Sequence, residues 1–381
     1  MESDRALAVC YFGTYRDDYS RNQMMIAGLR LNGVSVTECH EKLWYGIEDR
    51  VRVVSGEWTK PSFWWRMIKV YWHLFRRYLR IGDYDILIVG YPGQFDIFLA
   101  RILSWLKRRP LVWDIFMSIY LISVERGLDK GNKVSINLLR FIERTALKLP
   151  DQLILDTSEY VKWFSNNYQI KPARFRLVPT GADDRIFAPI PYTPEMNGKF
   201  RILYSGTFIP NHGVRYMVEA ARLLANEPNI LFEFIGKGPE LEIAQQFTLQ
   251  NQLTNIEFVG WMEKDQLIHR ISQADICLGA FGTTPQSLMT VQNKIYEALA
   301  MAKPLISGDS PAVRQCLQHG ENIYLCERAS GKSLADAIMI LYKDSSLREK
   351  IAQNGYKLYK EKYDLVHNGN RFAHHLREID R

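Results

Sequence analysis

The stretch "TVQNKIYEALAMAKPLIS" at residues 290–307 combines residue types that hold a charged, hydroxylated ligand. Its helical pattern turns an apolar face inward, begins near Asn293, and puts Lys294 and Glu297 on one side, one turn apart. Such an opposite-charge pair at the start of an otherwise apolar helix is a candidate part of a binding site. A surface ion pair worth roughly 0.2–0.5 kcal/mol is the alternative interpretation of the spacing.

Three further strand-like runs in the second half of the chain end in loops that contain glycine. Glycines let the backbone approach a ligand, and the N–H groups at a helix start favour an anion such as pyrophosphate. Because the carboxyl ends of parallel strands share one sheet edge, we expect these loops to meet at one site. The candidate binding residues are Gly206, Thr207, His212, Gly213, Lys237, Gly260 and Trp261, beside Asn293, Lys294 and Glu297.

These loops need a scaffold in which strands and helices alternate, and both halves of the chain predict one. The second half has short β-branched runs separated by helical patterns, which is typical of parallel βαβ units. The runs are "RILYSG", "ILFEFIG", "IEFVG", "DICLGA", "PLISGD" and "IYLC". The first half repeats the scheme with "LAVCYFG", "SVTECH", "DILIVG", "PLVWDI", "QLILDT" and "FRLVPT". The sequence predicts an α/β fold of two Rossmann-like domains that face each other across a cleft.

Length and composition fit two such domains. The 381 residues exceed what one core usually holds, and 47% hydrophobic with 24% charged residues is typical of a globular protein. A proline-containing stretch near residues 189–199 interrupts both periodicities. We therefore expect a first domain at residues 1–190 and a second at 191–365, with the terminal helix 366–381 packing back on the first.

Several classes of protein are disfavoured by what the sequence lacks. Five scattered cysteines without CxxC spacing predict neither a disulfide framework nor a zinc site, and a reducing cytoplasm fits them. The start has no signal-peptide pattern, and no uncharged stretch reaches membrane-spanning length. "DYD" at 83–85 precedes a strand, so we interpret it as a strand-entry cap and expect no metal. Neither half has GxGxxG after its first strand, which argues against a dinucleotide, and we expect no cofactor.

Taken in order, the motifs resemble the retaining glycosyltransferases of family 4, the group 1 glycosyltransferases, which adopt the GT-B fold. "ERTALKLPDQLILDTSEYVKWF" and "RLVPTGADDRIFAP" look like that family's approach to its interdomain linker. "YSGTFIPNHGVRYMVEAA", "FIGKGPE", "FVGW" and "VQNKIYEALAMAKPLI" look like its donor-binding domain. The resemblance implies a nucleoside diphosphate sugar as donor, with Glu297 on the ribose hydroxyls, Lys294 near phosphate, and backbone near Gly260 and Trp261 against the base.

The chain departs from the family pattern at three positions. The family usually has two glutamates eight positions apart, and the first position here is Met289. Its phosphate clamp usually has an arginine and a lysine where this chain has Thr207 and His212. One lost clamp group costs roughly 2–4 kcal/mol of transition-state stabilisation. Either Lys294, Lys237 and a donating or protonated His212 compensate, or the protein is inactive.

In the first half, the resemblance implies acceptor binding by the loop after the first strand, at Gly13, Thr14 and Tyr15. The charges of that loop also fit a solvated segment. Asp114 ends the strand-like run in "LVWDIFMSIY", where the family has its catalytic-side residue. A carboxylate there would stabilise an oxocarbenium-like transition state or orient the acceptor hydroxyl, or else cap the following segment. Both interpretations stay open, and Asp114 is a catalytic candidate together with Lys294 and Glu297.

The net charge of +7 lies wholly in the first half of the chain. Residues 1–190 hold 28 of the 49 Lys and Arg residues and 21 of the 42 Asp and Glu residues, so the rest of the chain has 21 basic and 21 acidic residues. "WTKPSFWWRMIKVYWHLFRRYLRIG" contains no acid and predicts an amphipathic helix that suits an anionic membrane surface. A core-packed helix with a solvated basic face is the alternative, and nucleic acid is a weaker one. The candidate membrane-contact residues are Trp64, Arg66, Lys69, Trp72, Arg76, Arg77 and Arg80.

Together these features favour a metal-independent, retaining glycosyltransferase of the hexosyltransferase type. It would move a sugar from a nucleoside diphosphate sugar to a hydroxyl acceptor, lipid-linked or a polysaccharide precursor in cell-surface glycan synthesis, in the cytoplasm or peripherally on the inner face of the membrane. The alternative is a non-catalytic nucleotide-sugar-binding or membrane scaffold protein. An epimerase or hydrolase acting on the donor alone is a third hypothesis.

Overall fold

The structure is a computed structural model, and it describes residues 6–43, 57–128, 133–191 and 198–379. The chain divides into two compact units, Met1–Pro179 with Leu365–Arg381 and Thr180–Asp364. The division therefore comes earlier than the boundary that the sequence predicts at 190/191. Ala182 and Phe187 explain the difference, since both are buried in the core of the second unit. Part of the predicted linker lies outside the described residues.

The first unit is built on a six-stranded sheet of order β2-β1-β3-β4-β5-β6, in which every pairing is parallel. Its strands are β1 Ala8–Gly13, β2 Ser35–His40, β3 Ile86–Val89, β4 Leu111–Asp114, β5 Gln152–Leu155 and β6 Phe175–Leu177. β3, β4 and β5 are buried along their whole length, which matches the continuous apolar runs of a sheet covered on both faces.

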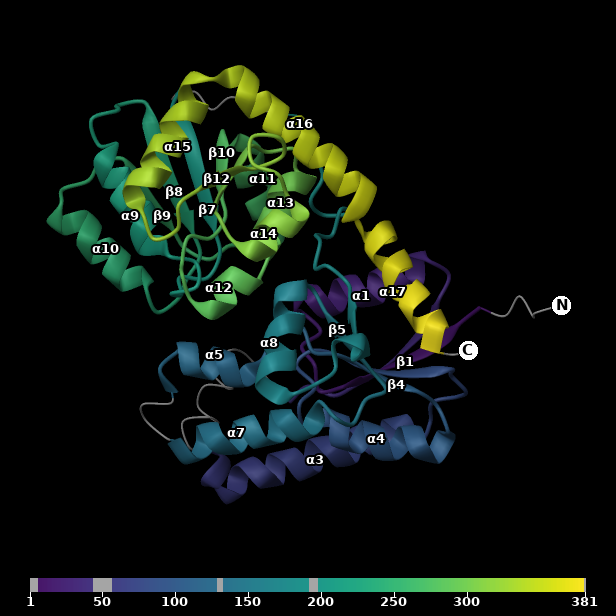
Figure 1. Cartoon of the computed structure of the whole chain (residues 1–381). Helices are drawn as coiled ribbons and strands as arrows, with labels where there is room; N and C mark the ends of the chain where they lie inside the picture. Colours follow the sequence, from purple (N-terminus) through teal and green to yellow (C-terminus); the bar gives the residue numbers. More distant parts are fainter. Residues whose placement is uncertain (1–5, 44–56, 129–132, 192–197, 380–381) are drawn as a thin grey trace. The chain divides into compact units, whose positions relative to one another are not determined.

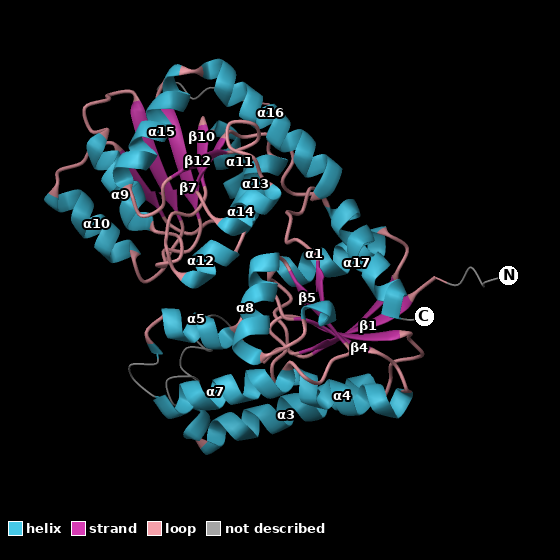
Figure 2. Cartoon of the chain, in the orientation of Figure 1, coloured by secondary structure: helices cyan, strands magenta, loops and turns pink. Residues whose placement is uncertain are grey.

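Helices cover both faces of this sheet (Figures 1 and 2). They are α1 Ser20–Leu31, α3 Pro61–Tyr78, α4 Asp96–Lys107, α5 Ile119–Glu125, α7 Lys133–Ala146, α8 Ser158–Tyr168 and α17 Leu365–Ile379, with short 3₁₀ turns η1 Glu57–Thr59 and η2 Pro172–Arg174. α3, α4 and α7 lie on one side, and α17 packs along α1 on the other. Gly28 and Gly369 allow the α1–α17 contact, because a Cβ on Gly369 would lie 2.0 Å from the carbonyl oxygen of Gly28.

The second unit has a second parallel six-stranded sheet, of order β12-β11-β10-β7-β8-β9. Its strands are β7 Phe200–Ser205, β8 Ile230–Ile235, β9 Ile256–Val259, β10 Ile276–Leu278, β11 Leu305–Gly308 and β12 Tyr324–Cys326. Its helices are α9 Val214–Leu223, α10 Leu241–Gln250, α11 Lys264–Gln273, α12 Pro285–Met289, α13 Asn293–Ala300, α14 Pro311–Cys316, α15 Gly331–Lys343 and α16 Ser345–Lys362.

Both sheets have the order of a doubly wound nucleotide-binding fold. Each strand-like run of the sequence forms a strand, and the apolar face of α9, with Met217, Val218 and Ala221, is buried in the core of the second unit. The prediction of two Rossmann-like α/β domains is therefore confirmed. Its physical basis is local: short apolar runs must be covered on both faces, and amphipathic helices supply the cover.

Candidate functional site

The switch point of the second sheet lies between β7 and β10, because the chain runs outward from β7 to β8 on one side and reaches β10 on the other. Open parallel sheets collect ligands beyond the carboxyl ends of their strands at such a point. Gly206 follows β7 directly, and the loop after it leads through His212 and Gly213 to α9. The sequence-predicted residues therefore meet at the edge where a ligand is expected.

Close backbone approach explains the glycines of this edge. A Cβ on Gly206 would lie 2.6 Å from Nζ of Lys294, and its φ of +148° disfavours any side chain. A Cβ on Gly236 would lie only 2.0 Å from the carbonyl oxygen of Gly206. A Cβ on Gly213 would lie 2.5 Å from the backbone nitrogen of Gly282, which follows β10. The loops after β7, β8 and β10 are thus packed together at backbone distance.

Lys294 is the cation of this edge. It is buried in the first turn of α13, and its Nζ lies 4.0 Å from the ring centroid of Tyr204 and 3.3 Å from Nδ1 of His212. Burial lowers the pKa of Lys294 to about 7, while Glu297 works in the opposite direction. A buried ammonium held against an aromatic face gains strongly from an anion that enters its surroundings.

His212 is a neutral part of the same cluster. Burial and the adjacent Lys294 lower its pKa well below the usual value. Nδ1 lies 2.6 Å from the carbonyl oxygen of Thr207, which can only accept, so we assign the ring hydrogen to Nδ1. The neutral ring then presents Nε2 as an acceptor. The cationic role considered for His212 is therefore wrong, and its Nδ1 donor is used within the loop.

Glu297 is half-buried one turn further along α13. Burial raises its pKa to about 7, with Lys294 and Lys264 opposing the rise. Among the described residues no ion pair within 4.0 Å joins Glu297 to Lys294, although each affects the pKa of the other. The simple surface ion pair considered from the spacing is therefore wrong, and each group keeps capacity for a ligand.

Two more predicted residues lie at neighbouring strand ends. Lys237 follows β8 and Trp261 follows β9, and Nζ of Lys237 lies 5.8 Å from the Trp261 ring. Both side chains are exposed, and a Cβ on Gly260 would meet nothing within 4 Å. The indole face and the open backbone beside it are a suitable surface for stacking a planar group.

Arg328, which follows β12, is a further residue of this edge that the sequence motifs do not predict. It is buried, and it donates from Nε to the carbonyl oxygen of Asp309 at 2.7 Å. From Nη1 it donates to the carbonyl oxygen of Gly282 at 2.6 Å and to Oγ of Ser287 at 2.8 Å. Arg328 thus ties the loop after β10 to the end of β11. A charged residue directly after an apolar strand was the signal available in "LCERASG".

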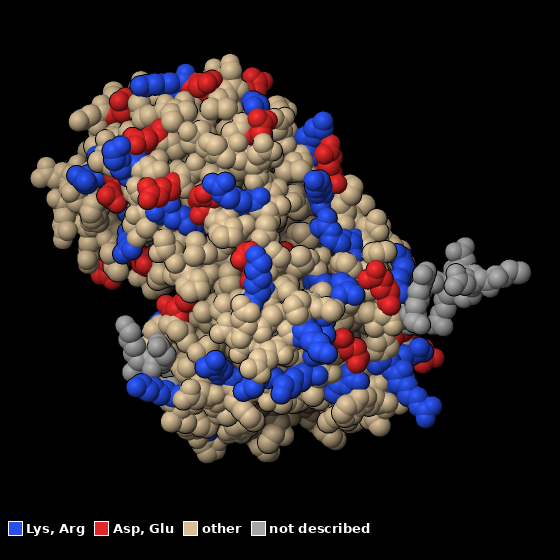
Figure 3. All heavy atoms as spheres, in the orientation of Figure 1, with Lys and Arg blue, Asp and Glu red and all other residues tan. Residues whose placement is uncertain are grey.

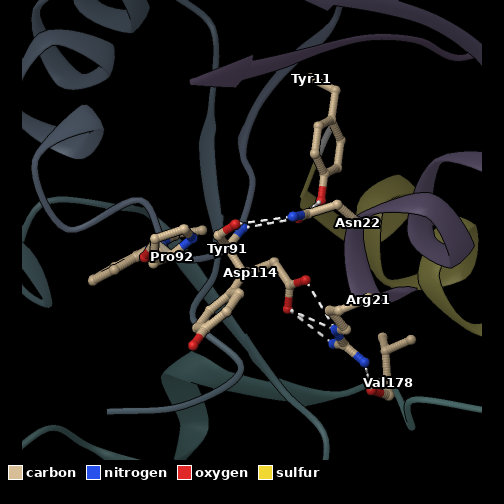
Figure 4. Close-up of polar contacts among 8 residues, drawn as sticks. Tyr11, Arg21, Asn22, Tyr91, Pro92, Asp114 and Val178 are labelled. Carbon is tan, nitrogen blue, oxygen red and sulfur yellow. Dashed lines mark hydrogen bonds and ion pairs between the residues drawn. The ribbon is translucent and has the colours of Figure 1, made fainter. Parts of the chain in front are cut away.

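Asp114 has a different environment from the one expected (Figure 4). It is fully buried, and its oxygens accept from Nη2 of Arg21 at 2.8 Å and from Nε at 3.0 Å. Nη1 of Arg21 donates to the carbonyl oxygen of Val178 at 2.7 Å. The predicted direct role of Asp114 in catalysis is wrong for this geometry. The capping alternative is wrong too, because Oγ of Ser118 caps the next helix.

Arg21 and Asn22 make the start of α1 a buried polar centre of the first unit. Asn22 accepts from the backbone nitrogen of Tyr91 at 3.0 Å and donates to the carbonyl oxygen of the same residue at 2.9 Å. The Asp156 carboxyl, directly after β5, is also buried, and burial raises its pKa to about 7 while Arg21 opposes the rise. Through Arg21 and Asn22 this centre joins α1 to the loop after β3, to the end of β4 and to the residue after β6.

The predicted acceptor loop is fixed by hydrogen bonds to the side chain of Asp96. The carboxylate of Asp96 accepts from the backbone nitrogen of Thr14 at 2.8 Å and from Oγ1 of Thr14 at 2.9 Å. A Cβ on Gly13 would lie 2.6 Å from the same carboxylate. The hydroxyl of Tyr15 donates to Glu38 at 3.0 Å, and both Thr14 and Tyr15 are buried. The solvated alternative concerns the charged residues of this loop, and it holds for Asp17 and Asp18, which are exposed.

α3 packs inward with Phe63, Met67, Leu74 and Tyr78 rather than with its tryptophans. The predicted aromatic stripe is exposed instead: Trp64 is 51% exposed and Trp72 is 58% exposed. α3 is therefore packed on the core with basic residues exposed, as the alternative states, but not through Trp64 and Trp72. Of the basic candidates, Arg77 pairs with Glu41 at 3.0 Å, Arg66 lies over the Phe63 ring, and Lys69, Arg76 and Arg80 are exposed.

The described residues contain neither a candidate metal site nor a candidate membrane-spanning helix. Within them, no group of three or more His, Cys, Asp or Glu side chains is placed to hold a metal ion. None of their helices is both long and apolar enough to span a bilayer.

Comparison with known families matches both units. Residues 199–344 fit the family model "Glycosyl transferases group 1", and residues 20–181 fit the "Glycosyl transferase 4-like domain". The chain belongs to the group 1 glycosyltransferases. The resemblance seen in the motifs is confirmed.

Among individual relatives, 180 residues are 27% identical to alpha-D-kanosaminyltransferase of Streptomyces kanamyceticus, over 47% of this chain and 45% of that protein. A second relative is the capsular polysaccharide biosynthesis glycosyltransferase CapM of Staphylococcus aureus. It is 21% identical over 179 residues, which are 45% of this chain and 44% of that protein. The chain thus spans less than half the length of these relatives.

Solved structures agree over nearly the whole chain. The sucrose-phosphate synthase of Thermosynechococcus elongatus superposes with a TM-score of 0.73 at 14% identity, over 98% of this chain and 99% of that one. Anabaena HepE, in complex with UDP-glucose, gives a TM-score of 0.67 at 15% identity over 98% and 99%. At such identities the likeness shows the fold, which is GT-B.

Proposed function

We propose that this protein is a retaining, metal-independent glycosyltransferase that moves a sugar from a nucleoside diphosphate sugar to a hydroxyl acceptor. The single observation that carries the proposal is the cluster at the switch point of the second sheet. There Lys294 lies against Gly206, where a side chain would collide with its Nζ. A backbone held open beside a buried cation is suited to a phosphate group.

Each part of the donor has a matching group in this proposal. Lys294 takes the diphosphate, and its ammonium stabilises the charge that develops on the leaving group. Glu297 accepts from the two ribose hydroxyls, and Trp261 with the open backbone at Gly260 takes the base. Nε2 of His212 accepts from a sugar hydroxyl, since its ring is neutral. The binding of UDP-glucose by Anabaena HepE supports a uridine nucleotide as the first to test.

The acceptor in this proposal is a lipid-linked or polysaccharide precursor, bound by the first unit at the loop of Gly13, Thr14 and Tyr15. The relatives named for polysaccharide synthesis, such as CapM, support it. The exposed tryptophans and basic residues of α3 support peripheral attachment to a membrane whose surface is anionic.

The test is thermal unfolding with UDP, GDP, ADP and CMP, applied to the wild type, Lys294→Ala and Glu297→Ala. A nucleotide at about 100 times its dissociation constant adds ~2.7 kcal/mol of stability. Lys332→Ala is the matched control, because Lys332 is an exposed lysine of the same unit and pairs with Asp336 on its own helix. We expect one nucleotide to stabilise the wild type and the control, and neither site variant.

Transfer is then measured with the sugar nucleotide of the base that binds. Product carrying the sugar on a hydroxyl acceptor supports a transferase, whereas free sugar or an altered sugar nucleotide supports a hydrolase or epimerase. A wild type that no nucleotide stabilises, at concentrations that reveal millimolar binding, overturns the donor site and favours the scaffold alternative. Thr207, His212 and Met289, which stand where the family usually has an arginine, a lysine and a glutamate, are the basis of that alternative.

A further inference from the structure

The first unit contains an apolar pocket away from the polar centre at Arg21. Its volume is about 90 Å³, several times the roughly 10–15 Å³ that one water needs. Trp58, Phe63 and Trp64 line one side, the loop Pro92–Phe95 lines a second, and α5 and α7 line the rest. The α5 and α7 residues are Ile119, Ser135, Leu138, Leu139 and Ile142.

Most polar groups beside this pocket are used within the protein, and Oε1 of Gln94 is a buried acceptor without a hydrogen-bond partner among the described residues. Asp96 and Thr14 close its inner end, and Asp96 accepts from Thr14 and from the hydroxyl of Tyr71 at 2.6 Å. Oγ of Ser135 accepts from Nε1 of Trp58 at 2.7 Å. A ligand that fills the pocket therefore meets carbon on most sides, and a hydrocarbon matches it best.

The mouth of the pocket lies on a large apolar surface. Trp64 and Leu138 line the pocket and are also exposed, so they mark its rim. α3, α4 and α7, which are neighbours in Figure 1, carry most of the exposed large apolar side chains of the first unit. These are Trp64, Trp65, Ile68, Trp72, Leu79, Phe98, Ile102, Trp105, Leu106, Val134, Leu138 and Phe141.

The exposed charged side chains of these three helices are all basic. Their acidic residues are Asp96 and Glu143, both buried. Their basic residues are Arg66, Lys69, Arg76, Arg77, Arg101, Lys107, Lys133, Arg140 and Arg144. Figure 3 shows Lys and Arg side chains in a row on the first unit, next to a surface on which no acidic side chain is visible.

We propose that this pocket takes the hydrocarbon chain of an anionic lipid, from a membrane on which the face of α3, α4 and α7 docks. The charge pattern favours a membrane over a protein partner, since the charged side chains of these helices other than the buried Asp96 and Glu143 are all Lys or Arg. Glu41 and Asp151 on neighbouring elements pair with two of them, Arg77 and Arg101, and the remaining cations beside aromatic and aliphatic residues suit an anionic lipid surface. The proposal rests on the proposed function only in that the lipid would be the sugar acceptor.

The first experiment measures chain binding without a membrane. Octyl, decyl and dodecyl phosphate are titrated below their critical micelle concentrations, with inorganic phosphate as the chain-free control, and unfolding of the first unit is followed. Each methylene that enters an apolar site adds ~0.8 kcal/mol, so affinity should rise roughly fourfold per methylene until the pocket is full. Inorganic phosphate should give no stabilisation.

Variants separate the pocket from the face. Ile142→Phe puts extra volume into the pocket from a partly exposed position, and Val134→Phe adds the same ring to the exposed side of α7 outside it. We expect Ile142→Phe to weaken decyl phosphate binding at least tenfold and Val134→Phe to leave it unchanged. Both should keep the wild-type unfolding transition of the first unit without ligand, which reports that this unit folds, and the wild-type nucleotide stabilisation of the second unit.

The second experiment measures sedimentation with vesicles of phosphatidylglycerol and phosphatidylcholine. Wild type should bind the anionic vesicles, and Trp65→Ser with Trp72→Ser should reduce that binding, because both side chains are exposed. Chain-length-dependent binding by the wild type supports the proposal whether or not a nucleotide binds. Equal amphiphile binding by Ile142→Phe and wild type overturns it. A concentration-dependent dimer that ignores vesicles overturns it too, since a second copy would then cover the face.

Discussion

Asp114→Asn tests whether the buried pair with Arg21 is structural. The substitution keeps the shape of the side chain but removes the negative charge, and it turns an amide NH₂ or a single neutral oxygen toward the guanidinium. Arg21 has no exposed surface and would keep its charge in the core. Breaking a buried ion pair from one side costs about 3–5 kcal/mol.

The structure favours the lower end of that range. Asp156 also interacts with Arg21, and its pKa of about 7 means that it can ionise further when Asp114 no longer competes. We therefore expect a loss of about 3 kcal/mol, which for a unit of this size lowers Tm by roughly 6–12 °C. Differential scanning calorimetry measures it, and nucleotide addition identifies the transition of the second unit.

Two controls sharpen this prediction. Asp18→Asn makes the same change in the exposed pair of Arg16 and Asp18, which should cost less than about 1 kcal/mol. The double variant Arg21→Met with Asp114→Leu should recover most of the loss, because an apolar pair of similar volume leaves no unpaired charge. If Asp114→Asn melts at the wild-type temperature and abolishes transfer, Asp114 acts directly in catalysis and the structural account is wrong.

Three more predictions concern the second unit. Because Lys294 has a pKa of about 7, its protonated fraction falls above that pH, and the affinity for a nucleoside diphosphate should drop up to tenfold per pH unit above 7. Titration calorimetry at several pH values measures this slope, and Lys294→Met should lose it. Gly206→Ala should weaken nucleotide binding at least tenfold, since φ is +148° and the new methyl would displace Nζ; unchanged affinity would mean that the Lys294 position does not matter. Arg328→Gln, which removes the tie to Ser287 and the loop after β10, should raise KM for the donor more than it lowers kcat, as steady-state kinetics would report.

The sequence by itself determined the strands, the two-domain scheme and the edge at which Gly206, Lys294 and Glu297 meet. Those features follow from local patterns: apolar runs of strand length, amphipathic helices, and glycines directly after strands. In parallel sheets the carboxyl ends of strands lie at one edge, so residues distant along the chain can be brought to one site from order alone.

Only the tertiary structure decided the partners and the inward faces. Asp114 and Arg21 are 93 residues apart, and nothing in "LVWDIFMSIY" indicates that a guanidinium will enclose its carboxylate. α3 has apolar residues on more than one side, so its neighbours determine that Phe63 and Leu74 are buried while Trp72 is exposed. Burial also moves the pKa of Lys294. Periodicity records that a helix has apolar sides, but burial, charge state and pairing depend on atoms from elsewhere in the chain.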